Sequence, residues 1–254
     1  ASIPAIALSA ALAITGSWAE RSIATRQLQR LLPHATIVDT CDSPSGRFTI
    51  AKANGTSMVL RDGRVVANYP EPTEPTISAA LAMAQAHNAA KILIIGDHNE
   101  ELARALLRYP QAKKINLVST DEKASAFLNT ALSEHTAEVL ADSRVEVLHG
   151  DPRALITEHQ SASWDLVFVA VGDPDNGATN RLYTTDFYRT LIEAMSPEGV
   201  LVTRATAGAN FMGPELAAFG GSMLSSLEDA FSDVALAAGD PVRFYSSPGL
   251  GVVS

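Results

Sequence analysis

The stretch WDLVFVAVGDPDNGATNRLYTTDFY, residues 164–188, decides the fold of this chain. It begins with the apolar run WDLVFVAV, which is typical of a strand buried on both faces of a parallel sheet. GDPDNG then breaks the chain, and TTDFYRTLIEAM predicts a helix. Ligands of open α/β sheets bind beyond the carboxyl ends of the strands. Asp173 and Asp175 are therefore expected at the edge of a site, although Asp-Pro and Asn-Gly pairs also simply make turns.

Strands and helices alternate from Lys91 to the C-terminus. Strands are predicted at KILIIG (91–96), KINLVS (114–119), RVEVLHG (144–150) and GVLVTRA (199–205), with helices at 99–108, 122–140, 152–158, 184–195 and 213–231. DVALAAG (233–239) and VRFYSS (242–247) are expected to form an antiparallel pair at the sheet edge. The alternation predicts an α/β domain, a parallel sheet with helices on both faces.

The pattern changes in the part of the chain before Lys91. From Thr36 to Tyr69, short runs rich in β-branched residues are separated by SPSG, NGT and RDG, which predicts a small antiparallel β domain over 36–69. The next segment, PEPTEP at 70–75, has three prolines and is expected to be a stiff linker that excludes helix. A helix is expected only from Ile77 to Ala86, and the larger domain is assigned to 70–254.

The N-terminal segment, residues 1–33, is expected to be helical until Pro33 ends it. Ile3 to Ala19 is apolar but shorter than the roughly 20 residues that span a membrane. No basic leader or cleavage site indicates a signal peptide. Two interpretations are left: an apolar helix packed on the domain, or the remnant of a membrane region. The start at Ala1, without an initiator methionine, favours a processed or shortened chain.

Composition excludes several classes of function. The formal net charge of −9 argues against a nucleic-acid partner, which would need a basic face. The single cysteine, Cys41, rules out an internal disulfide framework. None of the six histidines pairs at helical ligand spacing, so no metal site is expected.

The loop after the first strand of the larger domain reads IGDHNEEL. It has one glycine, Gly96, where the dinucleotide fingerprint has three, so a dehydrogenase is not favoured. Asp97 and Glu100 instead fit the N-cap and N3 positions of a capping box. A helix that caps itself in this way has less need of a ligand at its N-terminus.

Five stretches, taken in order, resemble successive motifs of the spermidine synthase (polyamine aminopropyltransferase) family. They are KILIIGDHNEELARALL, RVEVLHGDPRALI, the stretch at 164–188, SPEGVLVTRA and NFMGPEL. The likeness is closest to the soluble domain of bacterial proteins that fuse such a domain to a multi-span membrane region. DSPSGRFTI, the DGR turn and PEPTEP also match the small β domain and linker of that group. The order and spacing of the motifs carry the resemblance.

The resemblance implies a fold and a reaction. The fold is the class I SAM-methyltransferase-like (Rossmann-like) one, with a mostly parallel seven-stranded sheet and the small N-terminal antiparallel β domain. The co-substrate is decarboxylated S-adenosylmethionine, without a metal, and its aminopropyl group passes to a polyamine-type amine. The resemblance also implies a homodimer, a small-molecule amine or nucleoside as ligand, and a cytoplasmic location. That location is the cytosolic face of a membrane if residues 1–33 are a tether.

The resemblance also places residues on the nucleoside side of the site. Gly96 matches the first glycine of the cofactor loop, which also holds Asn99. Ser119 stands where the family has an acid that binds the ribose hydroxyls, and Asp121 matches the second acid of that motif. Asp151 matches the acid that contacts the adenine amino group. Asp121 and Asp151 equally fit helix starts.

On the acceptor side, Asp173 matches the second half of the family's D-x-x-D-P motif, and Ala170 replaces its first aspartate, the general base. Asp173 or Asp175 is left as a replacement base, and Tyr183 matches a tyrosine at the acceptor site. Tyr188 is expected in the core. Two interpretations stay open: an aminopropyltransferase, or a binding or assembly module that keeps the fold with a degenerate site.

Overall fold

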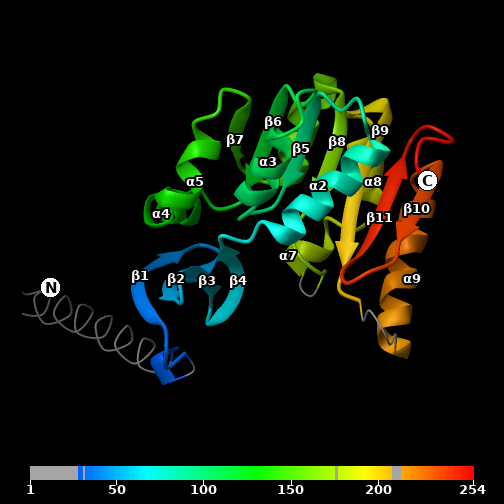
Figure 1. Cartoon of the computed structure of the whole chain (residues 1–254). Coiled ribbons are helices and arrows are strands. Elements are labelled where there is room, and N and C mark those ends of the chain that lie inside the picture. Colours follow the sequence, from blue (N-terminus) through cyan, green and yellow to red (C-terminus); the bar gives the residue numbers. More distant parts are fainter. Residues whose placement is uncertain (1–27, 31, 175–176, 208–212) are drawn as a thin grey trace, which may run out of the picture. The chain divides into compact units, whose positions relative to one another are not determined.

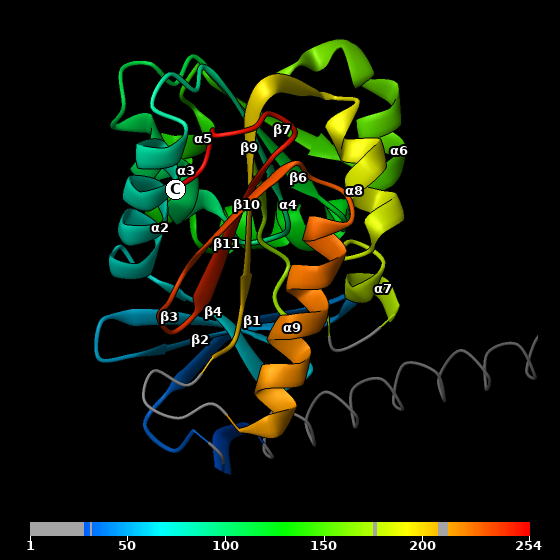
Figure 2. The same cartoon turned by 90° about the vertical axis from the view of Figure 1, so that its right-hand side faces the viewer.

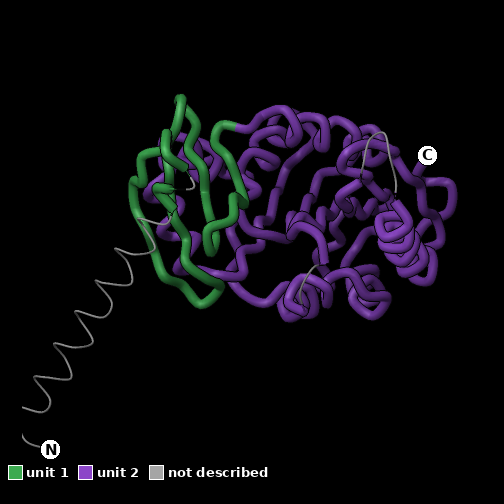
Figure 3. Tube along the Cα trace, turned by 90° about the horizontal axis from the view of Figure 1, so that it is seen from below, with its two compact units in different colours: residues 1–70 green, residues 71–254 purple. Residues whose placement is uncertain are grey.

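The structure, a computed structural model, describes residues 28–30, 32–174, 177–207 and 213–254. The chain divides into two compact units, residues 1–70 and 71–254 (Figure 3). The predicted N-terminal helical segment, and with it the proposed membrane tether, falls almost entirely outside the described residues. Within those residues, no helix is both long and apolar enough to span a bilayer.

The first unit contains the small antiparallel sheet that the sequence predicts. Its strands are β1 (Thr36–Ser43), β2 (Gly46–Ala53), β3 (Thr56–Arg61) and β4 (Arg64–Tyr69), paired in the order β1-β2-β3-β4. Asn54-Gly55 and Asp62-Gly63 connect the last three strands with positive φ angles, which tight hairpin turns require. Leu60 and Ala51 pack with Leu28 in a separate small core.

The second unit is built on one sheet with the strand order β10-β11-β9-β8-β5-β6-β7 (Figure 1). Its strands are β5 (Lys91–Ile95), β6 (Lys114–Ser119), β7 (Val145–His149), β8 (Trp164–Val169), β9 (Met195–Ala205), β10 (Asp233–Ala237) and β11 (Val242–Ser247). The first five run parallel, while β10 and β11 form the antiparallel pair at the edge. The predicted mostly parallel seven-stranded sheet is confirmed.

Helices cover both faces of this sheet (Figure 2). They are α2 (Thr73–Gln85), α3 (Glu100–Leu107), α4 (Glu122–Ala131), α5 (Ser133–Leu140), α6 (Pro152–Glu158), the 3-10 turn η1 (Gln160–Ala162), α7 (Gly177–Asn180), α8 (Thr185–Ile192) and α9 (Pro214–Glu228). Buried side chains of α2, α3 and α5 form the core on one face, and those of α6, α8 and α9 form the core on the other.

Two helix predictions need correction. The expected helix over 122–140 is broken at Leu132, which ends α4 and begins α5 with its side chain buried. The predicted linker at 70–75 does not exclude helix, because α2 already starts at Thr73 and contains Pro75. Pro75 lies in the first turn, where backbone N–H groups have no partner within the helix, so its missing N–H costs nothing. The Glu71 carboxylate accepts the free N–H of Thr73 at 3.0 Å.

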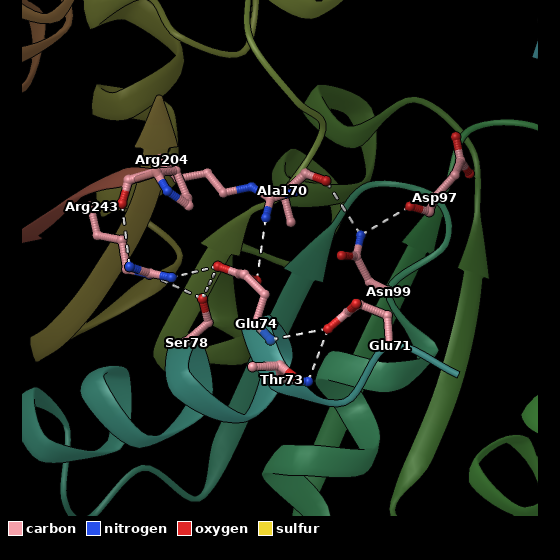
Figure 4. A network of polar contacts seen from close by, with 10 residues as sticks. Glu71, Thr73, Glu74, Ser78, Asp97, Asn99, Ala170, Arg204 and Arg243 are labelled. Atoms are coloured by element: carbon pink, nitrogen blue, oxygen red, sulfur yellow. Dashed lines mark hydrogen bonds and ion pairs between the residues drawn. The ribbon is translucent and has the colours of Figure 1, made fainter. Parts of the chain in front are cut away.

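An ion pair between the buried Arg243 and the half-buried Glu74 joins α2 to β11 (Figure 4). The Arg243 guanidinium, on a side chain that is 8% exposed, donates to Glu74 Oε1 at 2.5 Å and to Ser78 Oγ at 3.1 Å. A third bond, of 3.3 Å, goes to the carbonyl oxygen of Pro241. Because a buried charge is costly when its partner is lost, this pair is a stability determinant of the second unit.

We expect the substitution Glu74→Ala to lower the free energy of unfolding by about 3 kcal/mol, since it leaves the Arg243 charge buried without a carboxylate. Glu138→Ala is the matched control, because Glu138 also pairs with an arginine but its side chain is 87% exposed. Its loss should cost less than about 1 kcal/mol. Urea denaturation of both variants measures the difference, and equal values would contradict the structural role of Glu74.

Candidate functional site

Four parallel strands end together at one edge of the sheet. Where β6, β5, β8 and β9 pair with one another, the last paired residues lie in register: Val118 beside Ile95, Ile95 beside Val169, and Val169 beside Thr203. The residues that follow these four therefore form a line across the carboxyl edge, which we call the rim row. Its members are Ser119, Gly96, Ala170 and Arg204.

The rim row faces the side of the sheet that α2 and α3 cover. The residue two positions before each member of the rim row belongs to the core beneath these helices. These residues are Leu117, Ile94, Phe168 and Val202. Side chains on a strand alternate between faces, so the rim row continues this face of the sheet. The edge at which it lies is the one where open α/β sheets bind ligands.

Gly96 lets two strands approach each other at the rim. Its φ is +134°, and a Cβ atom there would lie 2.6 Å from the carbonyl oxygen of Ala170. The Asn99 side chain reinforces this contact, because its amide donates to the carbonyl oxygens of Gly96 at 2.9 Å, Asp97 at 3.1 Å and Ala170 at 3.4 Å (Figure 4). The Asn99 side chain thus holds the loop after β5 in place and connects it to the end of β8.

Asp97 does not form the predicted capping box. Helix α3 begins at Glu100 with Asn99 at its N-cap, two residues later than the motif requires. The Asp97 carboxylate instead accepts hydrogen bonds from Ser119 Oγ at 2.8 Å, from the N–H of Thr120 at 3.1 Å and from Thr120 Oγ1 at 2.8 Å. A carboxylate that belongs to the loop after β5 therefore lies at the end of β6.

Two acids of the predicted nucleoside side are helix N-caps. Asp121 accepts the N–H of Ala124 at 2.9 Å and begins α4. Asp151 accepts the N–H of Arg153 at 2.9 Å, begins α6 and forms an ion pair with Arg181. Burial raises the pKa of the Asp151 carboxyl, but the hydrogen bonds from Arg181 and from the backbone outweigh it and hold this pKa below its ordinary value. The helix-start interpretation of both residues is confirmed.

A hollow opens between the loop after β5 and the helices α4 and α5. Residues 96–100, Ser119, Ser125 and Asn129 contribute its polar lining, and Leu117, Leu128 and Leu140 contribute apolar lining. Its enclosed part measures about 30 Å³, and it reaches about 440 Å³ when the open space at its mouth is counted. The enclosed part is far smaller than the roughly 300–1,000 Å³ of small-molecule sites, so it is too small to enclose a nucleoside. A ligand would therefore lie at the open rim.

The loop after β8 is tied down by two residues of the predicted acceptor side. Tyr183 Oη donates to the carbonyl oxygen of Gly172 at 2.6 Å, and the Asp173 carboxylate accepts the N–H of Thr206 at 2.9 Å. Burial raises the pKa of the Tyr183 hydroxyl well above its ordinary value, so this group is neutral at physiological pH. Asp175 lies outside the described residues. Tyr188 is fully buried, as predicted.

Arg204 is the rim residue that the sequence analysis missed. Its guanidinium lies 3.5 Å from Glu74 Oε2, and its side chain is 39% exposed (Figure 4). A charged residue at the end of the otherwise apolar run GVLVTRA was the available signal. Across the part of the chain that the structure describes, no three His, Cys, Asp or Glu side chains are grouped as a metal would require.

The family model of the spermine/spermidine synthase domain matches residues 75–249 of this chain. A polyamine aminopropyltransferase of Oceanobacillus iheyensis is 32% identical over 130 residues, 50% of this chain and 25% of that protein. Another, of Prochlorococcus marinus strain MIT 9312, is 27% identical over 51% of this chain and 46% of that protein. The chain thus spans between a quarter and a half of the length of these relatives.

Two solved structures share the fold. A spermidine synthase in complex with the transition state analogue AdoDATO gives a TM-score of 0.73 at 18% identity, over 85% of this chain and 75% of that one. The spermidine synthase from Thermotoga maritima gives a TM-score of 0.70, also at 18% identity, over 85% and 74% of the two chains. At this level of identity the likeness establishes the methyltransferase-like fold alone.

Proposed function

We propose, from the premise that this chain belongs to the spermine/spermidine synthase family, that it binds an adenosyl nucleoside at the rim but transfers an aminopropyl group to diamines only poorly. The family transfers this group from decarboxylated S-adenosylmethionine to an amine. The observation that carries the proposal is the pair Ala170 and Arg204 in the rim row. Ala170 contributes only a methyl group and Arg204 contributes a cation, at the place where aminopropyl transfer to a diamine needs a base.

The nucleoside side supports binding. Gly96 allows the close approach of the loop after β5 to Ala170 at the rim, and Asp121 and Asp151 stand at the starts of the helices that follow β6 and β7. The family's ribose-binding acid is Ser119 in this chain, but the Asp97 carboxylate lies against that serine at 2.8 Å. We propose that Asp97 supplies the missing acid from the neighbouring strand. Its Oδ2 atom accepts one bond, from Thr120, and a carboxylate oxygen can accept a second.

The acceptor side does not support efficient transfer. An amine attacks only after it has lost its proton, and a positioned base contributes about 10²–10⁴ in rate. Ala170 cannot take a proton, and Oδ1 of Asp173 accepts the N–H of Thr206, which holds this carboxylate in the loop after β8 and not at position 170. Tyr183 is a neutral hydrogen-bond donor to its own loop. The same loss of the base favours a non-catalytic binding or assembly role as the alternative. For that role we propose a homodimer on the cytosolic face of a membrane.

The proposed role of Asp97 gives a direct test by calorimetric titration with methylthioadenosine. Asp97→Asn should weaken this binding by about tenfold, because a hydrogen bond to a charged acceptor is lost. The same variant should leave the weaker binding of the 2′,3′-dideoxy analogue unchanged.

Asp165→Asn is the matched control for Asp97→Asn. Asp165 also accepts backbone N–H groups, those of Ala90 and Lys91 at 2.9 Å each, but at the start of β8, the opposite end of that strand from the rim. Equal weakening by both variants would show that Asp97 acts through stability alone. Absence of methylthioadenosine binding to the unaltered chain would overturn the proposed function itself.

A further inference from the structure

Arg204 lies beside Ala170 on the same face of the sheet. The pairing of Phe168 with Val202 and of Val169 with Thr203 sets the register of β8 and β9. One residue further along, positions 170 and 204 are neighbours across the two strands. Phe168 and Val202, two residues before them, belong to the core beneath α2. Because side chains on a strand alternate between faces, the side chains of residues 170 and 204 lie on that same face. The cation at position 204 is therefore next to the position that carries the base in the family.

The charge of Arg204 is only partly compensated. Glu74 is the one acidic group within 4.0 Å of it in the described part of the chain, and their contact is 3.5 Å. The same carboxylate makes the shorter contact, 2.5 Å, with the buried guanidinium of Arg243. One carboxylate thus faces two guanidinium groups, and the more exposed of the two is the one at the rim. The group next to Ala170 on this face is therefore a cation, while the Asp173 carboxylate of the acceptor side is bonded to the N–H of Thr206.

This arrangement selects against a cationic ligand. A diamine carries an ammonium group at each end, and a like charge next to Ala170 repels it where the family attracts it. A carboxylate has the opposite properties, since a guanidinium binds it through two parallel charge-assisted hydrogen bonds. An arginine at the rim with only one long contact retains N–H donors for such a ligand.

We propose that Arg204 binds the carboxylate of an amino-acid-type ligand on the acceptor side of the rim. The inference rests on the proposed function, because the nucleoside side has to hold its ligand for this group to be placed. The carboxylate has two chemical sources. One is a donor that has not been decarboxylated, S-adenosylmethionine itself, and the other is a separate acceptor that carries both an amine and a carboxylate.

Calorimetry with paired ligands tests the two sources separately. The first pair is S-adenosylmethionine and its decarboxylated form, which differ only in the carboxylate. The second pair is 4-aminobutyrate and putrescine, titrated into the chain saturated with methylthioadenosine. At least one pair should show a preference of about tenfold or more for the carboxylate compound. Arg204→Gln should abolish that preference, Arg204→Lys should retain most of it, and neither should change the affinity for methylthioadenosine.

The outcomes separate the inference from the proposed function. Equal affinity within both pairs, with methylthioadenosine bound normally, overturns the role of Arg204 and leaves the proposed function standing. A preference for putrescine or for the decarboxylated donor, without a preference for the carboxylate compound in the other pair, also overturns it. No binding of methylthioadenosine overturns both. The preference is measured on the unaltered chain, so it does not depend on how well the variants fold, and thermal unfolding of each variant verifies that they do.

Discussion

The double variant Ala170→Asp/Arg204→Gln is expected to release methylthioadenosine from decarboxylated S-adenosylmethionine and putrescine about 100-fold faster than the unaltered chain. A positioned carboxylate that takes a proton from the attacking amine contributes about 10²–10⁴ in rate, and 100-fold is the lower end of this range. The rim places residue 170 next to Gly96 and in line with the ends of β5 and β9. A carboxylate introduced there would lie at the ligand-binding edge of the sheet.

Neither single substitution should restore the reaction. Aspartate at position 170 alone would pair with the neighbouring Arg204, and an ion pair favours the charged carboxylate and makes it a weaker base. Arg204→Gln alone removes the repulsion of the diamine but supplies no base. The increase in rate of the double variant should therefore be larger than the effects of the two single substitutions combined. Equal activity of the double variant and the unaltered chain, with methylthioadenosine bound normally by both, would contradict this account of the acceptor side.

The substitution Gly96→Ala is expected to have the largest effect on stability, a loss of about 3 kcal/mol or more in the free energy of unfolding. The added Cβ would lie 2.6 Å from the carbonyl oxygen and 2.8 Å from the carbonyl carbon of Ala170, and both are backbone atoms that cannot turn away. The φ of +134° adds strain for any residue with a side chain. Binding of methylthioadenosine should be lost together with the geometry of the rim.

Gly221→Ala is the matched control for Gly96→Ala. Gly221 lies within α9, and a Cβ atom there would have no neighbour within 4 Å. Alanine is favoured over glycine in a helix by about 0.8–1.0 kcal/mol, so this variant should be slightly more stable than the unaltered chain. Chemical denaturation measures both changes. If Gly96→Ala changes the free energy of unfolding by no more than about 1 kcal/mol, as expected for Gly221→Ala, the rim tolerates a wider separation of β5 and β8.

The sequence predicted the sheet well because buried parallel strands leave an unmistakable pattern. WDLVFVAV and KILIIG are continuous apolar runs, and both became central strands. The errors arose where the same residues allow two local structures. The three prolines of PEPTEP predict a linker without helix, although a proline such as Pro75 is compatible with a first turn. Asp97 fits a capping box by spacing, but its carboxylate accepts hydrogen bonds from Ser119, the last residue of β6, and from Thr120 after it.

The site was less accessible to prediction than the fold. Ala170 was identified as the missing base from resemblance, because its position in a motif is a property of the sequence alone. The importance of Arg204 could not be found in that way, since it depends on the register between β8 and β9 and on the competition with Arg243 for Glu74. Contacts between residues far apart in the chain, such as Glu74 and Arg243, are fixed only when the sheet has formed.

Equilibrium dialysis of decarboxylated S-adenosylmethionine that is radiolabelled in its adenosyl group, with the chain on one side of the membrane and putrescine on both, tests the central claim most directly. Separation of the nucleosides at the end of the incubation shows both how much is bound and how much has reacted. The account predicts that the label is retained on the protein side as unreacted donor or trace methylthioadenosine. Rapid and complete conversion to methylthioadenosine, or equal label on both sides, would contradict it.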